Sequence, residues 1–216
     1  MAAPLFTSEE LAQIQQAVQR AEAGSGGEIV PVLARQSSFY ESAYWRGGFL
    51  LALFTGILLT IFYFATDFLL FAPPHLWLLV VLAGGLLGAL ITLFVPAIKR
   101  LLIGQATQEA RVLDQAKTLF YDHGLTMTEQ RTGILLYISF FEHQAVILAD
   151  MGIDELVPQD VWQTMINELT GGLKQGRQVA SICATLEACG RLLEESGVQR
   201  AVDDDNELPN EVRVQE

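Results

Sequence analysis

Residues 47–65 read GGFLLALFTGILLTIFYFA, and residues 76–95 read LWLLVVLAGGLLGALITLFV. Neither run contains a charged side chain, and Asp67 is the only charged residue between positions 47 and 95. About 20 apolar residues let a helix cross roughly 30 Å of hydrocarbon. A helix of a soluble protein is seldom apolar on every face over such a length. The sequence therefore predicts a transmembrane helical hairpin at residues 47–100, with spans at about 47–65 and 76–95.

The flanks of these two runs carry side chains that suit a membrane interface. They are Trp45, Arg46, Trp77, Lys99 and Arg100. Aromatic rings favour the interface, and Lys and Arg gather on the cytoplasmic side. The connecting stretch, Thr66–His75, contains no Lys or Arg. We therefore expect a multi-pass protein of the cell membrane, with both termini and the soluble domain in the cytoplasm.

Small residues recur at four-residue spacing inside the hairpin, as Ala52/Gly56/Thr60 and Gly84/Gly88. This spacing permits close contact between membrane helices, so we expect these residues to pack the two spans together. A channel or transporter would be expected to place more polar groups within the bilayer. The small number of polar residues in the two runs therefore favours a membrane anchor over a channel or transporter.

The rest of the chain carries nearly all of the 25 acidic and 13 basic residues, which give a net charge of −12. Nucleic acid is excluded as a partner, because its phosphates require a basic surface. Many of the acids lie in residues 199–216, which contain little apolar sequence. That stretch predicts a disordered acidic tail.

The soluble sequence is divided into residues 1–46 and 101–198, which we expect to form one discontinuous α/β domain. Thr7 and Glu10 form a capping box before a helix that stops at residues 24–27. Apolar patterning then predicts strands at 28–34, 133–139 and 144–150, and helices at 105–123, at 158 to Gly171-Gly172, and at 176–196. Residues 133–139 (GILLYIS) read as a central strand covered on both faces.

The first two predicted strands and the helix between them resemble a βαβ unit, with the membrane hairpin inserted in the crossover. The last two strands should form an antiparallel hairpin. Pro31 lacks a backbone donor, so it predicts an edge position or a bulge for the first strand. The result is a small mixed sheet flanked by helices.

Three segments carry a resemblance to a known family: the capped N-terminal helix with GGEIVPVLA, the segment RTGILLYISFFEHQAVILADMGIDELVPQDVW, and the final helix pair. The sequence resembles the TPM domain family, in its membrane-bound branch. The resemblance implies a Rossmann-like α/β sandwich. It also implies divalent-metal binding, with Ca²⁺ or Mg²⁺ as the cation, phosphatase activity in some members, and roles as an auxiliary subunit of membrane complexes or in photosystem maintenance.

Candidate site residues cluster around the last two predicted strands. Asp150, Asp154, Glu155 and Asp160 follow the final strand, and hard cations prefer carboxylate oxygens; solvated loop acids at a helix start explain the same pattern. Arg131, with Thr132, could bind a phosphate or a carboxylate through two hydrogen bonds, or be a surface charge at the strand entry. Glu142-His143 lies in the predicted turn, where an exposed pair is expected and metal or acid–base chemistry is the alternative.

These features favour a membrane-anchored binding or accessory module whose partners are the lipid bilayer and other membrane proteins. The sequence contains no P-loop, G-x-S-x-G or H-E-x-x-H motif. A metal-assisted phosphatase using the acidic loop is the alternative, and it rests on the family resemblance. The partner and the oligomeric state do not follow from the sequence.

Overall fold

The computed structural model describes residues 4–66, 73–128, 130–197 and 212–215. Its internal contacts divide the chain into two compact units. Residues 1–37 and 109–216 form one of them, here the sheet unit, and residues 38–108 form the other, here the hairpin unit. The hairpin unit is therefore an insertion in the sequence of the sheet unit.

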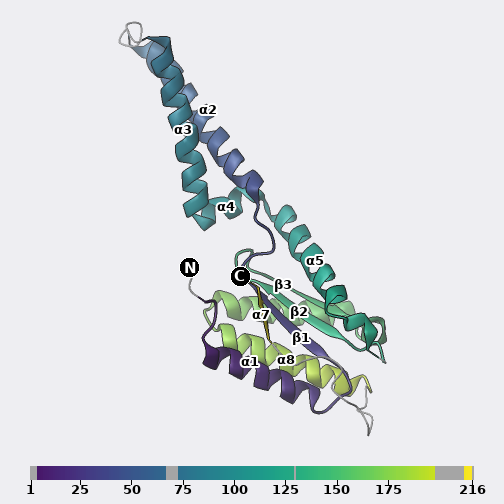
Figure 1. Cartoon of the computed structure of the whole chain (residues 1–216). Coiled ribbons are helices and arrows are strands. Elements are labelled where there is room, and N and C mark those ends of the chain that lie inside the picture. Colours follow the sequence, from purple (N-terminus) through teal and green to yellow (C-terminus); the bar gives the residue numbers. More distant parts are fainter. Residues whose placement is uncertain (1–3, 67–72, 129, 198–211, 216) are drawn as a thin grey trace. The chain divides into compact units, whose positions relative to one another are not determined.

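A four-stranded mixed sheet lies at the centre of the described part of the sheet unit (Figure 1). Its strands are β1 (Ile29–Ala34), β2 (Ile134–Ser139), β3 (Gln144–Ala149) and β4 (Arg213–Gln215), in the spatial order β3-β2-β1-β4. The parallel pairing of β1 with β2 and the antiparallel pairing of β2 with β3 confirm the predicted crossover and strand hairpin. Ala34 lies beside Ser139, so β1 and β2 finish at the same edge.

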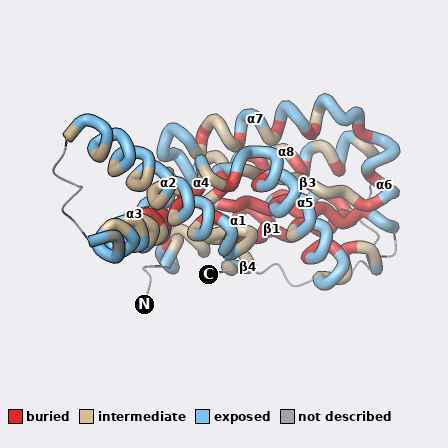
Figure 2. The backbone as a smooth tube through the Cα atoms, turned by 90° about the horizontal axis from the view of Figure 1, so that it is seen from above, coloured by how far each residue is buried: buried red, intermediate tan, exposed pale blue. Residues whose placement is uncertain are grey.

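Helices cover both faces of the sheet. α5 (Gln105–Asp122) lies on one face, while α1 (Ser8–Glu22), α7 (Gln159–Lys174) and α8 (Gln178–Glu195) lie on the other. Leu135 and Tyr137 of β2 enter the core beneath α5, and Leu136 and Ile138 enter the opposite core. β2 is buried along its whole length, as predicted for a doubly covered strand, and Figure 2 shows the buried strand residues in red between the helices.

The helix boundaries follow the sequence signals at α1 but not at α7. The Glu10 N–H donates to Thr7 Oγ1 at 3.3 Å, and the Thr7 N–H donates to Glu10 Oε2 at 2.8 Å, so the capping box is confirmed. The expected stop at Gly171-Gly172 is wrong, because α7 continues to Lys174. A Cβ at Gly172 would lie 1.8 Å from Ser181 Oγ of α8. Gly172 therefore serves close contact between two helices.

Two expectations about the sheet edge need correction. β4 pairs parallel with Val32–Ala34, so β1 is an inner strand and not at the edge, and its register with β2 runs through Pro31 without the alternative, a bulge. Pro31 is tolerated because it lies outside the stretch that pairs with β4. The tail prediction also fails for Arg213–Gln215, which form a strand. The acidic residues 203–205, 207, 211 and 216 lie outside the described residues.

The hairpin unit contains α2 (Glu41–Ala65), α3 (Pro74–Phe94) and the short α4 (Pro96–Ile103). The sequence pattern predicts α2 and α3 but not α4. Among the described residues, two helices, Glu41–Ala65 and His75–Phe94, are long and apolar enough to cross a membrane. Their large apolar side chains are exposed almost throughout, whereas a core helix of a soluble protein would bury them. Figure 2 shows the exposed surface of both helices in pale blue.

Glycines bring α2 and α3 into close contact. A Cβ at Gly88 would lie 2.4 Å from the Gly47 carbonyl oxygen, and one at Gly84 would lie 2.5 Å from Thr55 Oγ1. Gly84 and Gly88 therefore pack α2 against α3, as predicted. Gly56 differs, because its nearest neighbour would be Val81 at 4.0 Å. It lines an apolar surface groove of about 600 Å³.

Candidate functional site

Arg131 and Asp150 form an ion pair at the edge of the sheet where β2 begins and β3 ends. Arg131 Nε donates to Asp150 Oδ2 at 2.5 Å, and Nη2 donates to Oδ1 at 3.0 Å. The Asp150 side chain is 4% exposed and that of Arg131 is 48% exposed. Asp150 is also the N-cap of α6 (Met151–Asp154), accepting from the Met151 N–H at 2.9 Å. The two-bond contact predicted for Arg131 thus has a carboxylate of this chain as its partner.

The backbone around Arg131 is held from several sides. Its φ of 57° lies in the left-handed region, which non-glycine residues seldom adopt. The Arg131 N–H donates to the Thr128 carbonyl at 3.1 Å, and the Arg131 carbonyl accepts from the Gly152 N–H at 3.0 Å. A Cβ at Gly152 would lie 2.5 Å from the Gln130 carbonyl oxygen, so a glycine is required there. These contacts hold the segment before β2 against the start of α6.

The charges of the pair stabilise one another. Burial acts to raise the pKa of Asp150, but hydrogen bonds from Arg131 and the Met151 N–H, together with the guanidinium charge, outweigh it and hold that pKa below its ordinary value. The hydrogen bond and charge of Asp150 raise the pKa of Arg131. Both groups are therefore ionised at neutral pH, with Asp150 already occupied by its partner.

Thr132, the second residue of the predicted phosphate contact, is buried. Its N–H donates to Thr128 Oγ1 at 3.1 Å, and its hydroxyl donates to the Gly26 carbonyl at 3.3 Å. These contacts join the β2 entry to the loop before β1. The hydrogen bonds give Thr132 a structural role.

The structure does not bring the four predicted metal ligands together. Asp154 Oδ1 accepts from Gln159 Nε2 at 3.0 Å. Glu155, the C-cap of α6, and Asp160 on α7 are exposed. No group of three or more His, Cys, Asp or Glu side chains suited to a metal ion occurs in the part of the chain that the structure describes. With Asp150 engaged by Arg131, these residues as placed do not fit a Ca²⁺ or Mg²⁺ ion.

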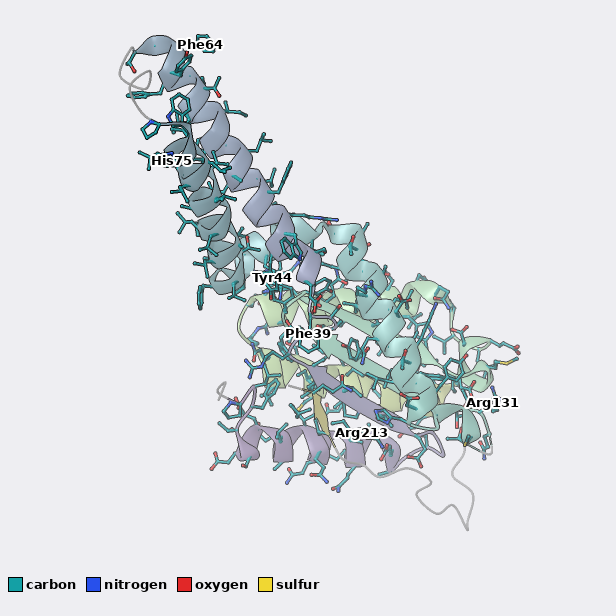
Figure 3. The ribbon with its side chains drawn as sticks, turned by 45° about the horizontal axis from the view of Figure 1, so that its top comes forward. Phe39, Tyr44, Phe64, His75, Arg131 and Arg213 are labelled. Atoms are coloured by element: carbon teal, nitrogen blue, oxygen red, sulfur yellow. The ribbon has the colours of Figure 1, made fainter. Side chains whose placement is uncertain are left out.

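Strand direction adds a further reason. Open α/β sheets bind ligands outside the carboxyl ends of their parallel strands. β3 runs antiparallel to β2, so Asp150 follows β3 at the edge where the parallel strands begin. The ion pair therefore lies at the opposite edge from the one where such folds bind ligands, and Figure 3 labels Arg131 at this edge.

The carboxyl edge holds a polar cluster that the sequence analysis does not predict. Of the turn pair expected to be exposed, His143 is exposed but Glu142 is buried. The Glu142 carboxylate accepts from the Ser37 N–H at 2.9 Å and from the Ser139 hydroxyl. The Ser37 and Tyr137 hydroxyls are 2.9 Å apart, and burial is the main cause that raises the pKa of Tyr137. Ser37 follows β1 and hydrogen-bonds to Glu142 and Tyr137, so the cluster joins the end of β1 to the β2–β3 turn.

A sequence signal for this cluster exists in hindsight. Ser139 is followed three residues later by Glu142, the spacing at which a serine hydroxyl and a glutamate meet in a local turn. The contribution of Ser37 had no such signal, because it lies 105 residues away in the sequence.

The predicted interface residues lie at the two ends of the hairpin unit. Arg46 Nη1 donates to the Leu102 carbonyl at 2.8 Å, and Lys99 lies over the Tyr40 and Tyr44 rings. The Trp77 ring packs edge-on against Tyr63, with centroids 5.4 Å apart. Figure 3 labels Tyr44 at one end of the hairpin and Phe64 and His75 at the other.

Comparison with known proteins agrees with this fold. The NMR structure of the BA42 protein from the psychrophilic bacterium Bizionia argentinensis is similar, with a TM-score of 0.61 and 20% sequence identity over 99% of this chain and 98% of that chain. At that identity the likeness shows the fold alone. No curated protein matches the sequence. A family model of the TPM domain matches residues 92–192, a range that begins near the end of α3 and extends into α8. Residues 92–192, just under half of the chain, are therefore similar to the TPM domain.

Proposed function

We propose that this protein is a membrane-anchored TPM-domain module that supports membrane protein complexes. The observation that carries the proposal is the insertion of two exposed apolar helices, α2 and α3, between strands of one sheet. Water disfavours so much exposed apolar surface, whereas lipid accepts it. The exposed helices are the anchor, and the sheet unit is the part available to partners.

The pairing of β1 with β2 supports two spans. The insertion leaves the sheet unit after β1 and returns before β2, and these strands are direct neighbours. Both ends of the insertion must therefore lie on the same side of the membrane. Two crossings meet this requirement and a single crossing cannot.

The distribution of basic residues supports a cytoplasmic sheet unit. Arg46, Lys99 and Arg100 lie at the ends of the insertion, and residues 66–75 contain no Lys or Arg. Lys and Arg near membrane helices are retained on the cytoplasmic side. We accordingly place both termini in the cytoplasm and the α2–α3 connection outside.

The polar groups of the sheet unit favour a binding module over an enzyme. Phosphoryl transfer needs a positioned nucleophile and stabilisation of the developing charge. Asp150 and Arg131 are paired with each other, and the Ser139–Glu142 pair is buried. These groups stabilise the fold, and a substrate would have to displace them.

An accessory role predicts that the protein is held in an assembly at its natural level. Expressed with a small tag from its own promoter and extracted in mild detergent, it should migrate on a native gel well above its 23.8 kDa mass and copurify with other membrane proteins. A matched strain with residues 41–104 replaced by a linker should lose these partners. A full-length protein that migrates alone, with no copurifying membrane protein, would contradict the role.

The enzyme alternative predicts activity that the binding module does not. We expect negligible turnover of generic phosphate esters by the purified full-length protein with magnesium, manganese or calcium, because the placed acids do not group around a cation. Asp150→Asn with Asp154→Asn is the matched control. Turnover that persists through purification and vanishes in this double variant would contradict the binding-module proposal and support the phosphatase alternative.

A further inference from the structure

The short helix α4 buries a charged side chain and exposes a large apolar one, the reverse of a helix on a water-exposed surface. Its Lys99 is 7% exposed, whereas Leu101 is 80% exposed. A helix on a soluble surface buries leucine and leaves the lysine ammonium in water. At the start of α2, Trp45 is 81% exposed. Leu101 and Trp45 lie outside the two predicted spans, so crossing the bilayer does not by itself account for them.

Aromatic rings and a hydrogen bond fix the cations near α4. Lys99 Nζ is 5.1 Å from the Tyr44 ring centroid and 6.0 Å from that of Tyr40, distances at which a ring face attracts a cation. Tyr40 has a φ of 51°, a conformation that persists only where the surroundings impose it. Arg46 Nη1 donates to the Leu102 carbonyl. The start of α2 and the end of α4 thus form one ordered cluster.

The backbone sets the direction of α4. Val95 is extended, with φ −112° and ψ 96°, and Pro96 occupies the first turn of α4. Proline cannot continue the hydrogen bonding of α3 and suits the start of a new helix. α4 contacts both α2 and α3, and Figure 1 shows it running across the end of the hairpin. A helix across a membrane-spanning hairpin lies near the membrane plane.

We propose that α4 is an interfacial helix that binds anionic phospholipid headgroups. Leu101 and Trp45 enter the acyl boundary, and Arg46 and Arg100 lie at the level of the phosphates, while Lys99 stays packed against Tyr40 and Tyr44. Helices of this kind insert Leu and Trp and keep Lys and Arg among the headgroups. Charge favours an anionic lipid, because Glu41 is the only acidic residue that the structure describes in the hairpin unit. This inference rests on the proposed membrane anchor.

The position of α4 can be measured with spin labels on the full chain in nanodiscs. Leu101→Cys and, as an aqueous control on the exposed face of α1, Gln19→Cys are made separately in a chain with Cys183→Ser and Cys189→Ala. We expect the label at 101 to collide more with oxygen than with a water-soluble nickel complex, and the label at 19 to show the reverse. Equal aqueous access at both sites would overturn the interfacial position.

The lipid preference can be measured in nanodiscs containing phosphatidylglycerol and phosphatidylcholine, by native mass spectrometry of the lipids that stay bound. We expect phosphatidylglycerol to be enriched, and Arg100→Gln to lower that enrichment by about fivefold, the effect of one basic residue at an anionic surface. Arg111→Gln on the exposed face of α5 should leave it unchanged. Equal retention of both lipids by the unaltered protein would overturn the headgroup site while leaving the anchor intact. Failure of the protein to enter the discs would instead refute the anchor.

Discussion

Replacing residues 41–104 with a flexible linker should convert the protein from a membrane protein into a soluble one that still folds. Both hydrophobic cores of the sheet unit consist of residues outside this segment. α5 remains as the crossover between β1 and β2 and, with 18 residues, exceeds the dozen or so that a parallel connection needs. The expected result is a protein in the high-speed supernatant with a single cooperative unfolding transition in urea.

Linker length provides the internal control for this prediction. The entropic cost of closing a loop rises slowly, by about 0.6 kcal/mol for each doubling of its length, so several linkers should give similar midpoints of unfolding. A product that stays aggregated or molten at every linker length would contradict the expectation. It would mean that the hairpin unit completes the core.

Replacing Asp150 with alanine should lower the free energy of unfolding by about 2 kcal/mol, the scale of a hydrogen bond to a charged group together with a lost helix cap. The substitution removes the acceptor of the Arg131 guanidinium and of the Met151 N–H. Asp154→Ala, an exposed acid four residues away, is the matched control and should change stability by no more than about 0.5 kcal/mol. Urea unfolding of the linker form measures both.

The same pair gives a pH dependence with a defined sign. The pKa of Asp150 is lower in the folded protein, so its contribution is fully present above the unfolded carboxyl pKa of about 3.9 and is lost as pH falls through the folded value. The difference between the wild type and Asp150→Ala should be constant from neutral pH to about pH 5, where the unfolded carboxyl is still mostly ionised, and should shrink in more acidic buffer. Equal losses for Asp150→Ala and Asp154→Ala would show that the ion pair does not stabilise the fold.

Local patterns were sufficient to predict the centre of the fold. The continuous apolar run of β2 marks it as central, and the helical spacing of apolar residues predicts α1, α5 and α8. β4 escaped prediction because Arg213-Val214-Gln215 contains a single apolar residue, and its strand conformation comes from pairing with β1. α4 escaped because apolar residues continue from α3 beyond Pro96, so composition does not mark the change in direction.

The candidate site depended on contacts that sequence spacing does not reveal. Asp150, Asp154, Glu155 and Asp160 are close in the sequence, which predicts a shared cation, yet Asp150 is paired with Arg131, which precedes β2 and lies 19 residues earlier in the sequence. The direction of β3 places this pair at the amino edge of the parallel strands. Glu142 is buried because Ser37 reaches it from the end of β1. The antiparallel pairing of β2 with β3 brings Arg131 to Asp150, and the long-range pairing of β1 with β2 brings Ser37 to Glu142.

The most direct test of the account is the side of the membrane on which two positions lie. In a chain with Cys183→Ser and Cys189→Ala, a single cysteine is introduced either at Asp67, which lies outside the described residues, or at Ser196 at the end of α8. Intact cells are treated with a membrane-impermeant thiol reagent. A two-span anchor with a cytoplasmic sheet unit predicts that the cysteine at 67 is labelled and that the cysteine at 196 is labelled only after the cells are opened. Labelling of 196 with protection of 67 would contradict the sidedness, and labelling of both positions in intact cells, or of neither, would contradict the two-span hairpin itself.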